Sequence, residues 1–282
     1  MSIQTVGVIG AGTMGNGIAQ VCALAGIKVV MVDISDAAVT KGKATIQSSL
    51  ERLVKKDKLT ASQMSESLAR VQGSTRYEDF KGVDLVIEAA TENQELKIKI
   101  LKQVDAIIGP DVILASNTSS ISITQLAAHT SRAERFIGMH FFNPAPIMQL
   151  VEVIRGLQTS DATHAAVEAL ARAIGKTPIT VRNAPGFVVN RILVPMISEA
   201  FFVLGEGLAT AEDIDAGMKL GCSMPIGPLA LADLIGLDTC LAVIEVYHRD
   251  FGDSKYRPAP MLKEMVAAGR LGRKSGQGVY KY

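Results

Sequence analysis

The feature that most constrains the fold is a glycine-rich segment between two short apolar runs near the N-terminus. Residues 3–9 are β-rich and lead into residues 10–15, GAGTMG, which match the pattern GxGxxG. A predicted helix follows over 13–25, and the apolar run 27–32 ends at Asp33. Apolar runs bounded by glycine are typical of strands buried on both faces of a parallel sheet. The segment therefore predicts a βαβ unit and an α/β fold.

In that context the glycine pattern indicates a dinucleotide site. Gly10 allows a tight turn, Gly12 lets the backbone approach a pyrophosphate, and Gly15 lets helix and strand pack closely. The helix N-terminus supplies unpaired N–H groups and a positive dipole end. Asp33 would accept hydrogen bonds from a ribose diol and repel a 2′-phosphate, which favours NAD over NADP. The alternative is a glycine turn that holds no ligand. We expect the cofactor to contact this segment at Gly10, Gly12, Thr13, Met14, Gly15 and Asp33.

The rest of the chain divides into an α/β part and a helical part. Residues 37–57 and 61–69 predict two helices, the second with Thr60 as its N-cap. Further strands are expected at 83–89, 112–115, 136–142, 150–154 and 177–181, and further helices at 93–107 and 161–174. Beyond Gly186 only helical patterns remain. We therefore predict a Rossmann-type NAD-binding domain over 1–185, with the helical pair inserted, followed by an all-α domain over 186–282.

Composition excludes several classes of protein. The 282 residues are 48% hydrophobic and carry a net charge of +1, which argues against disorder and against wholesale nucleic-acid binding. Three widely spaced cysteines without a CxxC pattern argue against a disulfide framework and a zinc module, and they fit a reducing compartment. Charged residues interrupt the most apolar stretch, 187–208, so no transmembrane helix is predicted. We expect a cytoplasmic protein with no metal, membrane or nucleic-acid partner.

Two candidate catalytic residues lie in predicted strands. His140 is near the end of its strand, where ligands of open α/β sheets bind, and an Asn-Pro turn follows. Glu152 lies between valines in an apolar run, and a buried carboxylate needs a partner. A histidine would serve, because the carboxylate holds one ring proton and supports imidazolium formation. The pattern leaves open a plain core histidine and an exposed edge-strand glutamate.

Two further polar features lie near expected strand or helix ends. The cluster 116–120, SNTSS, follows the predicted strand 112–115, where site groups belong. It is equally consistent with a turn that caps the helix expected near Ile123. Asn190 lies in the first turns of a mostly apolar helix, as a site residue or as a helix-end polar group.

With these residues gathered, the chain resembles the short-chain L-3-hydroxyacyl-CoA dehydrogenase family, and within it the stand-alone bacterial 3-hydroxybutyryl-CoA dehydrogenases. The resemblance covers essentially the whole chain. Six segments match in order: VGVIGAGTMGNGIAQ, VIEAATEN, ASNTSSISIT, GMHFFNPAPIMQLVEVI, NAPGFVVNRIL and GRKSGQGVYKY. The segments HFFNPAP and PGFVVNR are far more specific than the glycine pattern.

The resemblance implies NAD-dependent interconversion of (S)-3-hydroxyacyl-CoA, with 3-hydroxybutyryl-CoA expected, and 3-oxoacyl-CoA such as acetoacetyl-CoA. His140 resembles the general base that takes the 3-hydroxyl proton as hydride leaves for the nicotinamide. Glu152 resembles the carboxylate that orients this histidine and stabilises its charged form. Ser119 and Asn190 resemble the residues that hydrogen-bond the substrate oxygens.

The resemblance also implies contacts outside the glycine loop. Further NAD contacts are implied at Glu92, Lys97, Ser119, Asn143 and Lys274, and CoA contacts at Ser49 and Lys56. The helical pair carries a positive excess that suits the anionic phosphates of CoA, although a solvated helix face gives the same pattern. The C-terminal part resembles a dimerisation domain, so we expect a homodimer and a stand-alone enzyme.

Two alternatives remain at this stage. One is another two-domain hydroxyacid dehydrogenase, which would be expected to use a lysine as its acid and base. The other is a dinucleotide-binding protein without turnover, because a fold alone does not establish catalysis. The HFFNPAP segment and the basic helical pair after Asp33 argue against the first alternative. The joint presence of Ser119, His140, Glu152 and Asn190 argues against the second.

Overall fold

The computed structural model describes residues 3–282, which fall into two compact units. The first unit ends at Ala184 and the second runs from Pro185 to Tyr282. The described part of the first unit is a sheet with helices, and that of the second is helical. The predicted fold class, a Rossmann-type part followed by an all-α part, is therefore confirmed.

Eight strands of the first unit form one sheet in the order β3-β2-β1-β4-β5-β6-β7-β8. Their bounds are β1 Thr5–Ile9, β2 Lys28–Val32, β3 Val71–Ser74, β4 Leu85–Glu88, β5 Ile113–Ser116, β6 Phe136–Phe141, β7 Leu150–Arg155 and β8 Thr177–Arg182. The central strands β4, β5 and β6 are buried along their whole length, as their apolar runs predict.

The direction of the strands differs from the expected parallel sheet in one respect. Strands β1 to β6 are parallel, whereas β7 pairs with β6 in the antiparallel direction. The connection 142–149 between them contains no helix, and a parallel crossover requires a dozen or more residues. Strand β8 returns parallel to β7 through helix α6, Asp161–Ala173.

The strand order reverses between β1 and β4, and this point locates the site. From β1 the chain adds β2 and β3 on one side, and from β4 it adds β5 and β6 on the other. The loops that leave β1 and β4 therefore diverge and leave a crevice at the carboxyl edge of the sheet. The glycine loop 10–15 follows β1, and the segment 89–93 follows β4.

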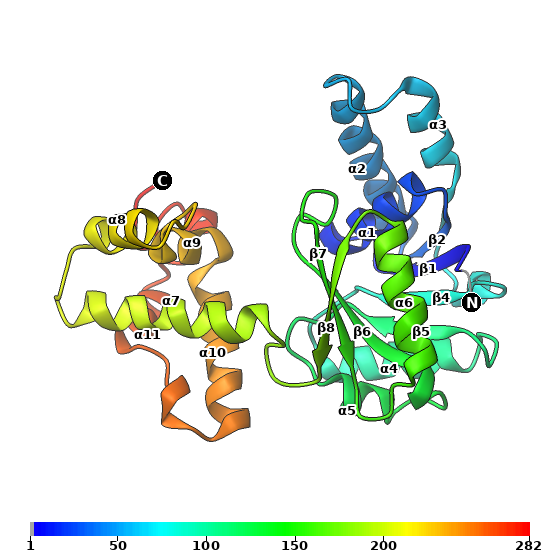
Figure 1. Ribbon diagram of the computed structural model, residues 1–282. Helices are drawn as coiled ribbons and strands as arrows, with labels where there is room; N and C mark the ends of the chain where they lie inside the picture. The colour runs from blue at the N-terminus through cyan, green and yellow to red at the C-terminus, as the bar shows by residue number, and fades with distance from the viewer. Residues whose placement is uncertain (1–2) are drawn as a thin grey trace. The chain divides into compact units, whose positions relative to one another are not determined.

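Helices flank this sheet. They are α1 Thr13–Leu24, α2 Asp36–Val54, α3 Ala61–Ala69, α4 Gln94–Asp105, α5 Ile123–Ala127 and α6. Figure 1 shows α2 and α3 standing out as a hairpin beside α1. Thr60 caps α3 as predicted, within a capping box formed with Gln63. Helix α2 ends at Val54, earlier than predicted, because turns occupy the residues up to Lys58.

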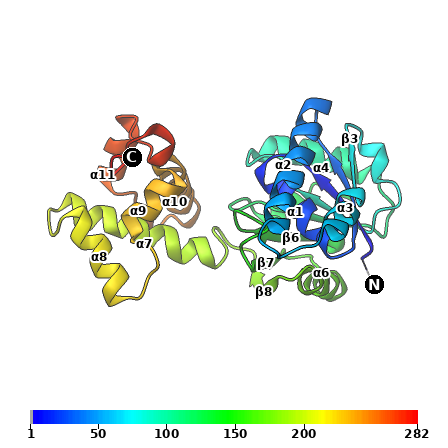
Figure 2. The ribbon, with the colours of Figure 1, turned by 90° about the horizontal axis from the view of Figure 1, so that it is seen from above.

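The second unit is built around α7, Val189–Gly205, with α8 Ala211–Gly221, α9 Pro228–Ile235, α10 Leu237–Phe251 and α11 Pro260–Ala267 (Figure 2). Its core contains Ile197, Phe201, Leu229 and Leu262. The buried Asp233 accepts hydrogen bonds from the backbone of Val279 and Tyr280 and so fixes the C-terminal segment. Over residues 3–282, no helix has the length and apolar character needed to cross a membrane.

Candidate active site

The glycine loop has the geometry that each of its three glycines predicts. Gly10 has a φ of +98°, and a Cβ there would lie 2.8 Å from the Ala89 carbonyl oxygen. A Cβ on Gly15 would overlap the Gly10 carbonyl oxygen, so helix α1 packs directly on the loop. Gly12 instead has open space where its Cβ would stand. That space, at the start of α1, fits the pyrophosphate of a dinucleotide.

Asp33 joins the end of β2 to the glycine loop. The backbone N–H of Ala11 donates to its Oδ2 at 2.6 Å, and that of Ile34 donates to its Oδ1 at 2.7 Å. A carboxylate has about four lone-pair positions, so both oxygens keep the capacity to accept from a ribose diol. The half-buried Asp33 thus lies beside the space over Gly12, as a ribose ligand requires.

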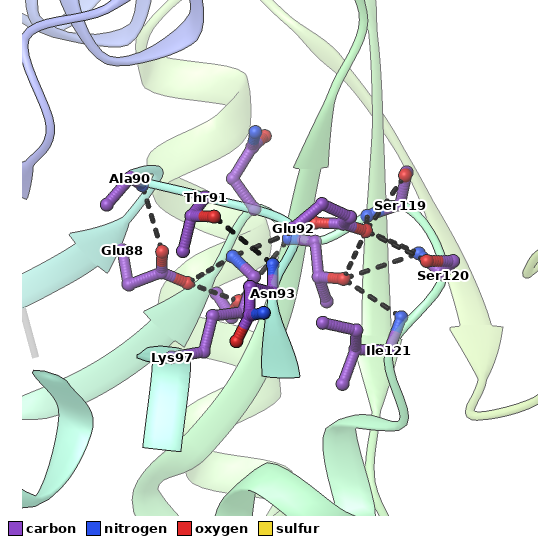
Figure 3. Close-up of polar contacts among 12 residues, drawn as sticks. Glu88, Ala90, Thr91, Glu92, Asn93, Lys97, Ser119, Ser120 and Ile121 are labelled. Atoms are coloured by element: carbon purple, nitrogen blue, oxygen red, sulfur yellow. Dashed lines mark hydrogen bonds and ion pairs between the residues drawn. The ribbon is translucent and has the colours of Figure 1, made fainter. Parts of the chain in front are cut away.

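The Glu92 carboxylate accepts hydrogen bonds from the loop that follows β5 (Figure 3). Its Oε1 lies 2.7 Å from the Thr118 hydroxyl, 2.8 Å from the Ser119 N–H and 3.0 Å from the Ser120 N–H. The hydroxyls of Ser119 and Ser120 both lie 3.0 Å from the same oxygen. One carboxylate oxygen offers about two lone-pair positions, so these donors compete. The Ser119 hydroxyl can therefore turn to another acceptor without leaving Glu92 unsatisfied.

Glu92 is held as a carboxylate. Burial alone would raise its pKa, but the Lys97 ammonium and the hydrogen bonds from Thr118 and Ser119 outweigh that effect. The net pKa lies below the ordinary glutamate value. The side chain of Glu92 is 43% exposed, so this charge also faces the solvent at the crevice.

Lys97, another predicted NAD contact, lies in the first turn of α4 and is almost completely buried. It is 1% exposed, and its Nζ lies 2.6 Å from Glu88 Oε2 and 3.8 Å from Glu92 Oε2. The fully buried Glu88 also accepts from the Ser116 hydroxyl at 2.8 Å and from the Ala90 N–H at 2.9 Å (Figure 3). The sequence analysis did not identify Glu88 as a site residue. The available signal was Lys97, a charged residue on the buried face of α4 together with Ile100, Leu101 and Val104.

His140 and Glu152 face each other across β6 and β7. They are direct register partners, 6% and 0% exposed respectively, and His140 Nδ1 lies 2.7 Å from Glu152 Oε2. β7 is paired on both sides, so Glu152 is not an edge-strand residue. An ionised Glu152 can only accept, so Nδ1–H donates to it, and proton exchange at this imidazole would use Nε2. The backbone N–H of Phe141 donates to Asn117 Oδ1 at 2.9 Å and ties this strand end to the loop after β5.

The remaining predicted residues lie in three places. Asn143 is exposed in the connection after β6, and its bond to Pro144 is cis. Ser49 is half-buried on α2, and Lys56 is exposed in the turn beyond it. In the second unit, Asn190 is the second residue of α7.

Lys274 also belongs to the second unit. Its Nζ lies 2.6 Å from Asp238 Oδ1. The contacts within the first unit thus join Glu92, Lys97 and Ser119 in one network and His140 and Glu152 in a pair. The described residues contain no cluster of histidine, cysteine and carboxylate side chains that fits a metal ion.

Two family models match the two units of the chain. Residues 5–184 match the family model described as 3-hydroxyacyl-CoA dehydrogenase, NAD binding domain, and residues 186–282 match the C-terminal domain of the same family. The chain belongs to the 3-hydroxyacyl-CoA dehydrogenase family. The family resemblance inferred from the sequence is confirmed, as are an NAD-dependent oxidoreductase and NAD as its cofactor.

Individual members of the 3-hydroxyacyl-CoA dehydrogenase family align over nearly full length. A probable 3-hydroxybutyryl-CoA dehydrogenase of Deinococcus radiodurans is 55% identical over 98% of this chain and 99% of its own. A 3-hydroxybutyryl-CoA dehydrogenase of Bradyrhizobium diazoefficiens is 51% identical over 99% of this chain and 96% of its own. The crystal structure of (S)-3-hydroxybutyryl-CoA dehydrogenase PaaH1 from Ralstonia eutropha superposes with a TM-score of 0.99 at 72% identity, covering 100% of this chain and 99% of PaaH1.

Proposed function

We propose that this chain interconverts (S)-3-hydroxybutyryl-CoA and acetoacetyl-CoA, with His140 and Glu152 as its acid–base pair. The observation that carries the proposal is the 2.7 Å contact between these two buried side chains at the carboxyl edge of the sheet. The substrate follows the names of the 3-hydroxybutyryl-CoA dehydrogenases to which the chain is similar.

The mechanism rests on how Glu152 holds the imidazole. Bound NAD supplies the hydride acceptor for the oxidation. His140 Nε2 takes the proton of the substrate 3-hydroxyl as the hydride leaves C3, and Glu152 stabilises the imidazolium through Nδ1–H. In the reverse direction the Nε2–H of the imidazolium protonates the 3-oxo oxygen as the hydride arrives. A positioned acid–base group of this kind is worth about 10²–10⁴ in rate.

Ser119 and Asn190 orient the substrate in this proposal. The Ser119 hydroxyl leaves its shared position on Glu92 Oε1 and donates to a substrate oxygen, while the other four donors keep Glu92 satisfied. Asn190, with its amide in the first turn of α7, supplies a second donor. Such donors stabilise most where negative charge develops on oxygen.

The remaining assignments follow the two parts of the chain. Residues 1–185 form the NAD-binding domain, in which Asp33 binds the adenosine ribose and the glycine loop binds the pyrophosphate. Residues 186–282 form the dimerisation and substrate domain. The additional NAD contacts are Glu92, Lys97, Ser119, Asn143 and Lys274, and the CoA contacts are Ser49 and Lys56.

A homodimer in the cytoplasm completes the proposal. Three large apolar side chains of the second unit, Ile192, Leu208 and Leu220, are exposed and would gain cover in a second copy. All three cysteines are free, which fits a reducing compartment. For this substrate class we propose a role in fatty acid and butanoate metabolism, with neither membrane nor nucleic acid as a partner.

The test is a turnover assay with matched controls. The purified protein is mixed with NADH and acetoacetyl-CoA, and the loss of NADH absorbance is followed against mixtures with NADPH or with free acetoacetate. The proposal predicts rapid loss only with NADH and the CoA ester together. No turnover while NADH still binds would favour a protein that binds dinucleotides without catalysis, and equal rates with free acetoacetate would overturn the CoA assignment.

A further inference from the structure

The ion pair between Glu88 and Lys97 lies where charged groups are costly. Both side chains are almost completely buried, and the distance between Lys97 Nζ and Glu88 Oε2 is 2.6 Å. A buried ion pair is weak evidence for stability, because well-packed apolar residues often serve as well. The pair lies at the carboxyl end of β4 and the first turn of α4, next to Glu92, and this place points to a role in arranging Glu92 and the groups bound to it.

Glu88 connects three elements at the carboxyl edge. It ends β4, its register partner on β5 is Ser116, and it accepts the Ser116 hydroxyl, the Ala90 N–H and the Lys97 ammonium. These donors satisfy both oxygens with charge-assisted or backbone hydrogen bonds. The carboxylate is therefore fixed, and it fixes Lys97 in turn.

Lys97 lies near two carboxylates but is within hydrogen-bond distance of only one of them. Its Nζ is 2.6 Å from Glu88 and 3.8 Å from Glu92, whose other oxygen faces the donors of residues 118–120 (Figure 3). Two carboxylates and one ammonium leave a net charge of −1, and the outer carboxylate carries it. If Glu88 were neutral, the ammonium would pair with Glu92 alone and draw it away from Ser119.

We propose that Glu88 is a positioning residue that acts through Lys97 on Glu92, and so sets where Ser119 stands in the crevice. It is not itself expected to touch the substrate or NAD. This inference rests on the proposed function for the role of Ser119, and the test below separates the two.

The experiment is a double-mutant cycle on Glu88 and Glu92. Glu88→Gln, Glu92→Gln and the double variant are compared with the wild type in kcat/KM for acetoacetyl-CoA and in NADH affinity, measured by nicotinamide fluorescence. A small displacement of a site group costs up to about 100-fold in rate, so Glu88→Gln is expected to lower kcat/KM by about 10- to 100-fold. The double variant should be no worse than Glu92→Gln alone, because Glu88 acts through Glu92.

A second ion pair of the same helix supplies the control. Asp105 ends α4 and pairs with the buried Arg132, away from the crevice. Asp105→Asn should lower Tm as Glu88→Gln does, while kcat/KM and NADH affinity stay at the wild-type values.

If Glu88→Gln does not fold, Glu88→Asp replaces it. That variant keeps the charge but is one methylene too short to reach Lys97 and Ala90 together, so a lower kcat/KM at wild-type Tm is expected.

The outcomes are distinct. Wild-type kcat/KM and NADH affinity in the folded Glu88 variant, or losses that multiply in the double variant, would overturn the inference. Wild-type protein without turnover would overturn the proposed function instead. In that case the coupling in NADH affinity still decides the role of Glu88, because that measurement does not need turnover.

Discussion

At the scale of single residues, strand register brings together two side chains twelve positions apart, the proposed acid–base pair. His140 and Glu152 stand directly opposite on antiparallel strands, so their side chains leave the sheet on the same face. Neither can turn away, since both are buried. The imidazole ring of His140 is thereby held in one orientation.

Glu152→Gln tests that orientation. The amide keeps the shape of the side chain but removes the charge that stabilises an imidazolium, so kcat should fall by about 10²–10⁴. NADH affinity, measured by fluorescence titration, should stay nearly unchanged, because Glu152 lies in β7 and the glycine loop follows β1. A variant with wild-type kcat would show that the contact is structural only.

Asp33→Ala tests the choice between the two nicotinamide dinucleotides. Loss of the carboxylate removes the acceptor for the ribose diol and the charge that repels a 2′-phosphate. In binding titrations, the affinity for NAD should fall far more than the affinity for NADP. Asp33 also holds the Ala11 N–H, so Asp33→Asn, which keeps an acceptor oxygen, is the control for loop disruption. An equal loss for both cofactors would contradict the ribose assignment.

Residue patterns predicted some of this local geometry and missed other parts of it. Each glycine of the loop has the geometry expected of it, because the pattern constrains backbone contacts within a few residues. The partner of Lys97 was not predicted, since Glu88 lies on a different element and the pairing depends on how α4 packs. A lysine on the apolar face of an amphipathic helix was the available signal.

At the scale of elements, the loop between β1 and α1 contains one glycine that packing requires and another that the proposed cofactor binding requires. Gly15→Ala would place a methyl group on the Gly10 carbonyl oxygen, whereas Gly12→Ala would enter open space at an ordinary φ. Gly15→Ala should therefore lower both Tm and NADH affinity, and Gly12→Ala should lower NADH affinity alone. Thermal denaturation and fluorescence titration of both variants measure this. Wild-type NADH affinity in Gly12→Ala would contradict the pyrophosphate assignment.

Most elements were predictable because their apolar runs or caps are local. The capping box of α3 is read directly from Thr60 and Gln63. Two features were not predictable in this way. Strand β3 was missed because VQGS is short and mostly polar, and its position beside β2 at the sheet edge supplies the pairing. The alternation of residues in β7 does not specify its direction, which follows from the connection 142–149, too short for a parallel crossover.

At the scale of the whole molecule, the reactivity of the cysteines tests whether the cores of both units are closed to a reagent. Cys22 is buried in the first unit and Cys240 in the second, and burial raises the pKa of each thiol to about 12. Cys222 is exposed. Because the thiolate is the reactive form, a thiol reagent at neutral pH should titrate one cysteine in the native protein and three after denaturation. Rapid reaction of a second thiol in the native protein would show that one unit is less closed than described.

The proposed mechanism depends on His140 as the group that moves the proton. The most direct measurement compares wild type and His140→Ala in single-turnover oxidation of NADH by acetoacetyl-CoA, with NADH affinity measured on the same samples. With His140 in this role, the variant should bind NADH nearly as the wild type does, and its rate of hydride transfer should fall by about 10²–10⁴-fold. A variant that binds NADH and turns over at the wild-type rate would contradict it.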